Sequence, residues 1–97
     1  MGASTSFRIY KASLGINAIK KLWMADVEQS LFEDGHSYSG EIGMLGPEIA
    51  NWFDQDKTRE EAYEFITSNH TKWRSAWAVS FILNDEKYWV IGGWCAS

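Results

Sequence analysis

The chain has 97 residues and a formal net charge of −4 at pH 7, with 45% hydrophobic and 15% aromatic residues. This length predicts a single domain spanning 1–97, and the acidic balance excludes non-specific nucleic-acid binding, which needs a surplus of Lys and Arg. One cysteine, Cys95, excludes an intrachain disulfide. No apolar run approaches the roughly 20 residues of a membrane helix, so we expect a cytoplasmic protein that does not enter a membrane.

The first half of the chain predicts a strand, a helix and a second strand. Residues 6–12 alternate weakly and predict a strand at a sheet edge, because one of its faces carries charge. Apolar side chains recur over 16–33 at three- and four-residue steps, which predicts an amphipathic helix. Asn17 is its expected N-cap and Gly35 its expected C-terminal stop. Residues 36–45 alternate again and predict a short, glycine-weakened strand.

The middle of the chain predicts two helices. Pro47 suits the first position of a short helix over 47–53, and the polar residues 54–57 predict a loop. The run Thr58-Arg59-Glu60-Glu61 has the spacing of a capping box, in which the Thr hydroxyl and the Glu carboxylate satisfy backbone amides reciprocally. We therefore expect a second main helix that ends near Ser68.

The last third predicts a β-hairpin. Residues 76–83 are apolar on both alternating faces, which predicts a central strand covered on both sides. The polar residues 84–87 predict the turn, and a second strand follows from Tyr88. The resulting order, β-α-β-α-β-β, predicts an α+β fold. We expect two layers, with a mainly antiparallel sheet of about four strands and both main helices on one face.

Metal and catalytic motifs are the next question. Neither His-Glu-x-x-His nor Cys-x-x-Cys spacing occurs, so we predict no metal and no cofactor, and Cys95 is expected to be a buried structural residue. The glycines of 40–46 match neither a dinucleotide-binding nor a P-loop pattern. The residues considered as metal ligands are Asp34, His36, Glu41, Asp54, Asp56, His70 and Cys95.

Aromatic and basic side chains gather on and near the hairpin. A flat base can stack on an exposed Trp for about 1–3 kcal/mol, and a nearby cation can bind its phosphate. Filling of the core is the competing interpretation for these Trp side chains; Trp73 and Trp89 are the ones we expect to be partly exposed. The candidate binding residues are Lys72, Trp73, Arg74, Lys87, Trp89 and Trp94.

Acidic residues gather between positions 48 and 64. Such a surface can dock a basic protein, although an acidic helix face is often only solvated. The candidate acidic face consists of Glu48, Asp54, Asp56, Glu60, Glu61 and Glu64.

The C-terminal part carries a resemblance to a known group of proteins. The segments that carry it are 61–66, Lys72-Trp73, 76–79 and the closing run 89–95, Trp-Val-Ile-Gly-Gly-Trp-Cys. Together they resemble small uncharacterised accessory proteins of tailed bacteriophages. The resemblance implies a small early protein that acts in the host cytoplasm by binding a host factor or a signal molecule.

Three functions follow from these observations. The leading hypothesis is a non-enzymatic binding protein that inhibits or sequesters a host or defence component. Its partner would be a protein, met by the acidic face, or a small nucleotide-like ligand, met by the aromatic hairpin. One alternative is a small hydrolase using His36 or His70 with a carboxylate. The other is a homo-oligomeric structural or assembly module, because aromatic patches favour interfaces.

Overall fold

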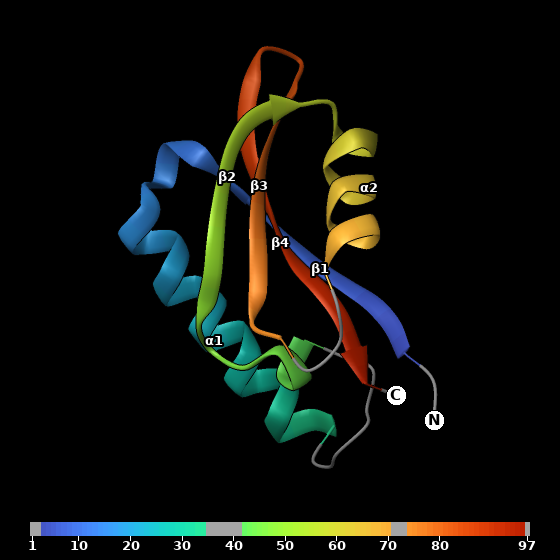
Figure 1. Cartoon of the computed structure of the whole chain (residues 1–97). Helices are drawn as coiled ribbons and strands as arrows, with labels where there is room; N and C mark the ends of the chain where they lie inside the picture. Colours follow the sequence, from blue (N-terminus) through green and yellow to red (C-terminus); the bar gives the residue numbers. More distant parts are fainter. Residues whose placement is uncertain (1–2, 35–41, 71–73, 97) are drawn as a thin grey trace.

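The computed structural model describes residues 3–34, 42–70 and 74–96, which form a four-stranded sheet flanked by two α-helices (Figure 1). The strand order is β1-β4-β3-β2. β4 is antiparallel to both β1 and β3, whereas β2 is parallel to β3. The predicted α+β class and the order β-α-β-α-β-β are confirmed. The elements are β1 (Ala3–Lys11), the 3-10 helix η1 (Ala12–Leu14), α1 (Ile16–Asp34), the 3-10 helix η2 (Ile42–Leu45), β2 (Ile49–Lys57), α2 (Arg59–Asn69), β3 (Ala76–Leu83) and β4 (Glu86–Ala96).

The two helices lie on opposite faces of the sheet, so the expected two-layer arrangement with both on one face is wrong (Figure 1). Trp23 of α1 belongs to a buried cluster with Ala78 and other α1-side residues of the sheet. Ile66 of α2 belongs to a second cluster with Val79. Adjacent residues of a strand point to opposite faces, so the apolar character of both faces of β3 requires a helix on each side.

The N-terminal strand is tied to α1 by a side-chain contact. The hydroxyl of Tyr10 in β1 donates a hydrogen bond to Oδ2 of Asp26 in α1. Burial, together with this hydrogen bond, raises the pKa of Tyr10, so the phenol stays protonated. β1 is an edge strand, as predicted. Asn17 lies inside α1, because the amide of Ile19 already donates to the carbonyl of Gly15 at 3.0 Å.

The second strand lies later in the chain than the alternation predicted. Residues 42–45 form η2, and the rest of the predicted strand, together with Gly35, falls outside the described residues. β2 instead occupies 49–57, where a short helix and a loop were expected. Its pairing with β3 shifts register between Ile49 and Asn51 and again between Phe53 and Lys57. These irregularities interrupt the two-residue alternation by which a strand is recognised.

The local sequence signals at the start of α2 and in the hairpin predict the structure better than the alternation did for β2. In the capping box, Oγ1 of Thr58 accepts the amide of Glu61 at 3.2 Å, and Oε1 of Glu61 accepts the amide of Thr58 at 3.1 Å. The hairpin turn is shorter than predicted. It consists of Asn84 and Asp85 alone, with φ angles of 52° and 64°, as in the type I′ turns that suit two-residue hairpins. Lys87 therefore belongs to β4 rather than to the turn.

Candidate binding groove

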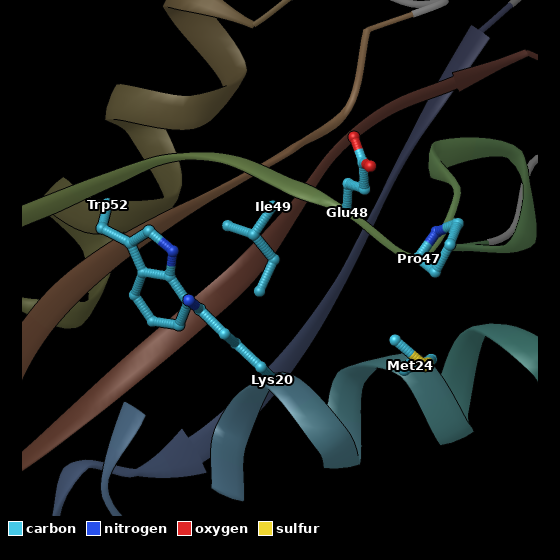
Figure 2. A pocket seen from close by; sticks show the side chains of 6 residues that line it. All are labelled: Lys20, Met24, Pro47, Glu48, Ile49 and Trp52. Carbon is cyan, nitrogen blue, oxygen red and sulfur yellow. The ribbon is translucent and has the colours of Figure 1, made fainter. Parts of the chain in front are cut away.

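A pocket of about 450 Å³ opens between α1 and β2. Helix α1 forms one wall, and the segment that enters and begins β2 forms the other (Figure 2). We call this pocket the α1–β2 groove. It is lined by Lys20, Met24, Pro47, Glu48, Ile49 and Trp52.

The helical wall of the groove borders the buried stripe of α1. Lys20 and Met24 each follow a buried residue, Ile19 and Trp23, and are one helical turn apart. They therefore share a face that is turned from the core toward β2. Met24 is 47% exposed, and its flexible thioether side chain can adapt to different apolar partners.

The strand wall depends on the first irregularity of β2. Ile49 pairs with Ala76, and Trp52 pairs with Ala78, although the two β2 residues are three positions apart. The extra residue of the bulge brings both side chains to the α1 face, where both pack against the α1-side cluster. Figure 2 shows both side chains directed from the strand toward α1.

Trp52 is held in place by a second aromatic ring. Its ring meets Trp89 of β4 edge-on, with centroids 5.0 Å apart and planes at 79°, an arrangement that aromatic pairs prefer. Trp89 is 5% exposed, and the Nζ atom of Lys87 lies 5.6 Å from its ring centroid. The groove thus has one aromatic wall whose orientation is fixed before a ligand arrives.

Charge is unevenly placed along the groove. The side chain of Lys20 extends from α1 into the groove, whereas Glu48 lies toward Pro47 with its carboxylate turned away from α1 (Figure 2). Within the described residues Lys20 makes no ion pair. The groove therefore offers an apolar floor with the cation of Lys20, and the carboxylate of Glu48 lies near its Pro47 end but is turned away from α1.

The second half of β2 is organised by a buried hydroxyl. Oγ of Ser80, a fully buried residue of β3, accepts the amide of Asp56 at 2.9 Å. The same hydroxyl lies 3.1 Å from Oδ1 of Asp54 and 3.2 Å from Oδ1 of Asp56, to which it donates. Asp56 has a φ of 48°, which costs a non-glycine residue energy, so Ser80 compensates for the strain of this bulge.

Lys87 completes this arrangement. Its Nζ atom lies 2.5 Å from Oδ1 of Asp54 and 3.3 Å from Oδ1 of Asp56. The hydrogen bond from Lys87 lowers the pKa of Asp54, and the same bond raises the pKa of Lys87. Both groups stay charged near neutral pH, so Lys87 does not supply the neutral amine that would activate Ser80 as a nucleophile.

Among the residues that the structure describes, the candidate binding residues of the hairpin do not share one exposed aromatic patch. Trp89 is buried, so the prediction that it is partly exposed is wrong. Trp94 is half-buried, and its Nε1 atom donates to the carbonyl of Thr67 at 2.8 Å. Lys87 is engaged by carboxylates, and Arg74 is exposed. Residues 72–73 lie outside the described residues.

The candidate acidic residues are also divided. All six are exposed. Asp54 and Asp56 bond to Ser80 and Lys87 at the edge of the sheet. The remaining four occupy other elements: Glu48 precedes β2, and Glu60, Glu61 and Glu64 lie on α2.

His70 has a structural role at the end of α2. Its Nε2 atom lies 2.8 Å from the carbonyl of Ser75, and its Nδ1 atom accepts the amide of Trp94 at 3.0 Å. Burial lowers the pKa of His70, which favours the neutral ring that these two bonds require. Both nitrogens face backbone groups, so the ring is not placed as a general base. The other candidate histidine, His36, lies outside the described residues.

Among the residues that the structure describes, no three His, Cys, Asp or Glu side chains gather as a metal site would require. Cys95 is buried, as expected of a structural cysteine. No helix in the described part of the chain is both long enough and apolar enough to cross a membrane.

Comparison with known proteins identifies no relative. No family model matches the chain, and neither a curated protein nor a solved structure matches it. The α1–β2 groove was also missed from the sequence, since Ile49 and Trp52 were assigned to a helix. The signal that could have found it is the uncharged run 49–53, which is rich in β-forming residues.

Proposed function

We propose that the protein is a non-catalytic binding protein that holds its target by an apolar side chain seated in the α1–β2 groove. The observation that carries this proposal is the groove itself, an opening of about 450 Å³ walled by Met24, Ile49 and Trp52. Its volume lies within the range of about 300–1,000 Å³ that is typical of ligand sites. Trp is also among the residues that most often dominate binding energy.

The chemistry of the groove supports binding rather than catalysis. Its two titratable residues are Lys20 and Glu48, and the carboxylate of Glu48 points away from α1 (Figure 2). The cluster of Ser80, Asp54 and Lys87 serves the backbone of β2 instead of an open site. The groove therefore supplies apolar contact area and charge, which are sufficient for recognition.

Sequestration of another molecule is the role that such a groove suits. A small domain with a preformed groove can engage a surface feature of its target and so block access to it. The resemblance to phage accessory proteins implies the same role in a host cytoplasm. We extend the proposal to that role, in which the target is a host or defence component.

The proposal can be tested by NMR with the full chain and two uncharged probes, N-acetyl-phenylalanine amide and N-acetyl-leucine amide. We expect shift changes at the Trp52 indole, the Met24 methyl and the Ile49 methyl groups. Trp52→Ala should weaken binding by about tenfold, the loss that follows from about 1.4 kcal/mol.

Phe32→Ala is the matched control, because Phe32 is an aromatic residue on α1 that is 89% exposed and does not line the groove. This variant should bind the probes as the wild type does. Shift changes centred elsewhere, or equal binding by Trp52→Ala, would overturn the proposal.

A further inference from the structure

β2 is an edge strand of the sheet. It pairs with β3 on one side, and within the described ranges no strand pairs with its other side. An open edge presents amide and carbonyl groups that can pair with another extended chain. The α1–β2 groove lies along the first half of this strand, beside Ile49 and Trp52.

The strand protects only part of its open edge. Residues 54–57 carry three charged side chains, and charges on an edge strand are a common means of preventing strand addition; the register of β2 shifts in both halves, so charge is what distinguishes them. Residues 49–53, Ile-Ala-Asn-Trp-Phe, carry no charge. The unprotected half is therefore the half that adjoins the groove.

We infer that an extended segment of a partner protein pairs with residues 49–53 as a fifth strand and places an apolar side chain in the α1–β2 groove. This inference rests on the proposed function and names its ligand. A strand added at the usual spacing of about 4.8 Å directs every second side chain toward one face of the sheet. On the α1 face, those side chains meet Met24 and Trp52.

Charge complementarity defines the segment further. The amine of Lys20, which makes no ion pair to another described residue, extends from α1 into the groove and favours a carboxylate on the partner, next to the apolar side chain. The carboxylate of Glu48, near the Pro47 end and turned away from α1, favours a basic residue on the opposite face of the partner segment. The expected partner segment is thus extended, apolar at its centre and oppositely charged toward its two ends.

A second copy of this chain fits the edge less well. Antiparallel self-pairing centred on Asn51 sets Glu48 of one copy opposite Asp54 of the other, twice in the dimer. Like charges directly opposite each other destabilise a strand pair. This argument favours a different protein as the source of the fifth strand.

The test uses the labelled 97-residue chain and the peptide acetyl-Lys-Thr-Val-Phe-Val-Asp-Thr-amide, in which the Asp side chain shares the face of the Phe side chain and the Lys side chain lies on the other face. Its reversed sequence and a version with Gln in place of both charged residues are measured beside it. NMR titration should show that at least one charged peptide binds about threefold to fivefold more tightly than the Gln version. Hydrogen exchange at the outward amides of 49–53 should slow in the complex.

Two changes separate strand pairing from filling of the groove. The amides of neighbouring residues in an extended peptide point to opposite edges. N-methylation of the amides of the first Val and of the Phe therefore removes one hydrogen-bond donor from each edge, whichever edge faces β2. We expect binding to fall about fivefold or more. In the protein, the double variant Lys20→Glu, Glu48→Lys should abolish or reverse the charge preference, whereas the exposed control Lys21→Glu should retain it.

The outcomes are distinguishable from those of the proposed function. If N-acetyl-phenylalanine amide fills the groove but no peptide binds, or if N-methylation has no effect, strand addition is wrong and the binding groove stands. If neither fragment nor peptide binds at the groove, both proposals fail. A dimer of the unliganded chain in light scattering, with 49–53 already protected from exchange, would assign the edge to a second copy and overturn the inference.

Discussion

The two halves of β2 differ in charge and in the contacts that their side chains make. Residues 49–53 are uncharged, and two of their side chains line the α1–β2 groove. Residues 54–57 are charged, irregular in register and fastened to β3 and β4 by Ser80 and Lys87. A single edge strand thus contains one segment that resists pairing and one that leaves pairing possible.

This difference suggests that residues 54–57 contribute to the stability of the strand and residues 49–53 to the binding of a partner. The charged half uses buried hydrogen bonds to hold an unfavourable backbone conformation at Asp56. The uncharged half needs no such support, because Ile49 and Trp52 pack against the α1-side cluster. Changes to the charged half should therefore alter stability, and changes to the uncharged half should alter binding.

The largest expected effect on this comparison comes from Ser80→Ala. The substitution removes the partly buried hydrogen bonds that Ser80 makes with Asp54 and Asp56, and because each such bond contributes about 0.5–1.5 kcal/mol, their loss should cost about 1–3 kcal/mol. Urea unfolding should show a loss of this size in the free energy of unfolding, with faster hydrogen exchange at Asp56. Ser68→Ala, at an exposed position of α2, is the control. An unchanged free energy of unfolding in Ser80→Ala would mean that this hydroxyl does not support the bulge.

A charge placed in the uncharged half should impair binding and leave the fold intact. Ala50 is exposed, and Lys on an edge strand opposes strand addition. We expect Ala50→Lys to bind the tighter charged peptide at least about fivefold more weakly, as measured by NMR titration. Gln55→Lys, an exposed position in the charged half, should bind like the wild type. Equal losses of peptide affinity in Ala50→Lys and Gln55→Lys would show that the two halves of β2 do not differ in binding.

Removing the charge of Lys87 should have a smaller effect. Lys87→Met keeps most of the side-chain length but loses the ion pairs to Asp54 and Asp56. The Asp54 side chain is 60% exposed, so solvent screens the interaction and a loss of about 0.2–1 kcal/mol in unfolding free energy is expected. Lys21→Met provides the comparison, because Lys21 is exposed on α1. A loss as large as that of Ser80→Ala would show that Lys87, rather than the hydroxyl, holds this half in place.

Acid should produce the smallest effect. The pKa of Asp54 is lowered from 3.8 in the folded protein by the hydrogen bond from Lys87. The stabilisation is therefore complete above 3.8 and is lost as the pH falls through the lower folded-state pKa. The difference in unfolding free energy between wild type and Asp54→Asn should therefore shrink as the pH falls below about 4 and through this lower pKa. A difference that stays constant over this fall in pH would contradict the link between Asp54 and Lys87.

Local interactions account for the parts of the fold that could be predicted. The capping box at Thr58 and Glu61 depends on residues three positions apart, so its spacing is visible in the sequence. The apolar alternation of β3 likewise marks a central strand. The same alternation already implied that both faces are covered, and the one-face arrangement of the helices conflicted with it.

β2 and the groove could not be predicted because they depend on distant partners. Parallel pairing joins Trp52 to Ala78, which lies far along the chain, and no turn motif in the local sequence predicts such a pair. The bulge that brings Ile49 and Trp52 to one face also removes the periodicity of the strand. Pro47 then suggested a helix where the structure has an edge strand. The candidate site thus arose from the least regular segment of the sheet.

The pairing of β1 with β4 has a consequence for synthesis of the chain on the ribosome. Phe7 lies opposite Gly92, and a Cβ built at Gly92 would come within 2.1 Å of the carbonyl oxygen of Ser6, so the two strands meet closely along their backbones. β1 emerges first, yet its only strand partner among the described residues is the last one made. β1 cannot form its strand pairing until β4 has left the exit tunnel. The sheet is therefore completed only after nearly all of its residues have been translated.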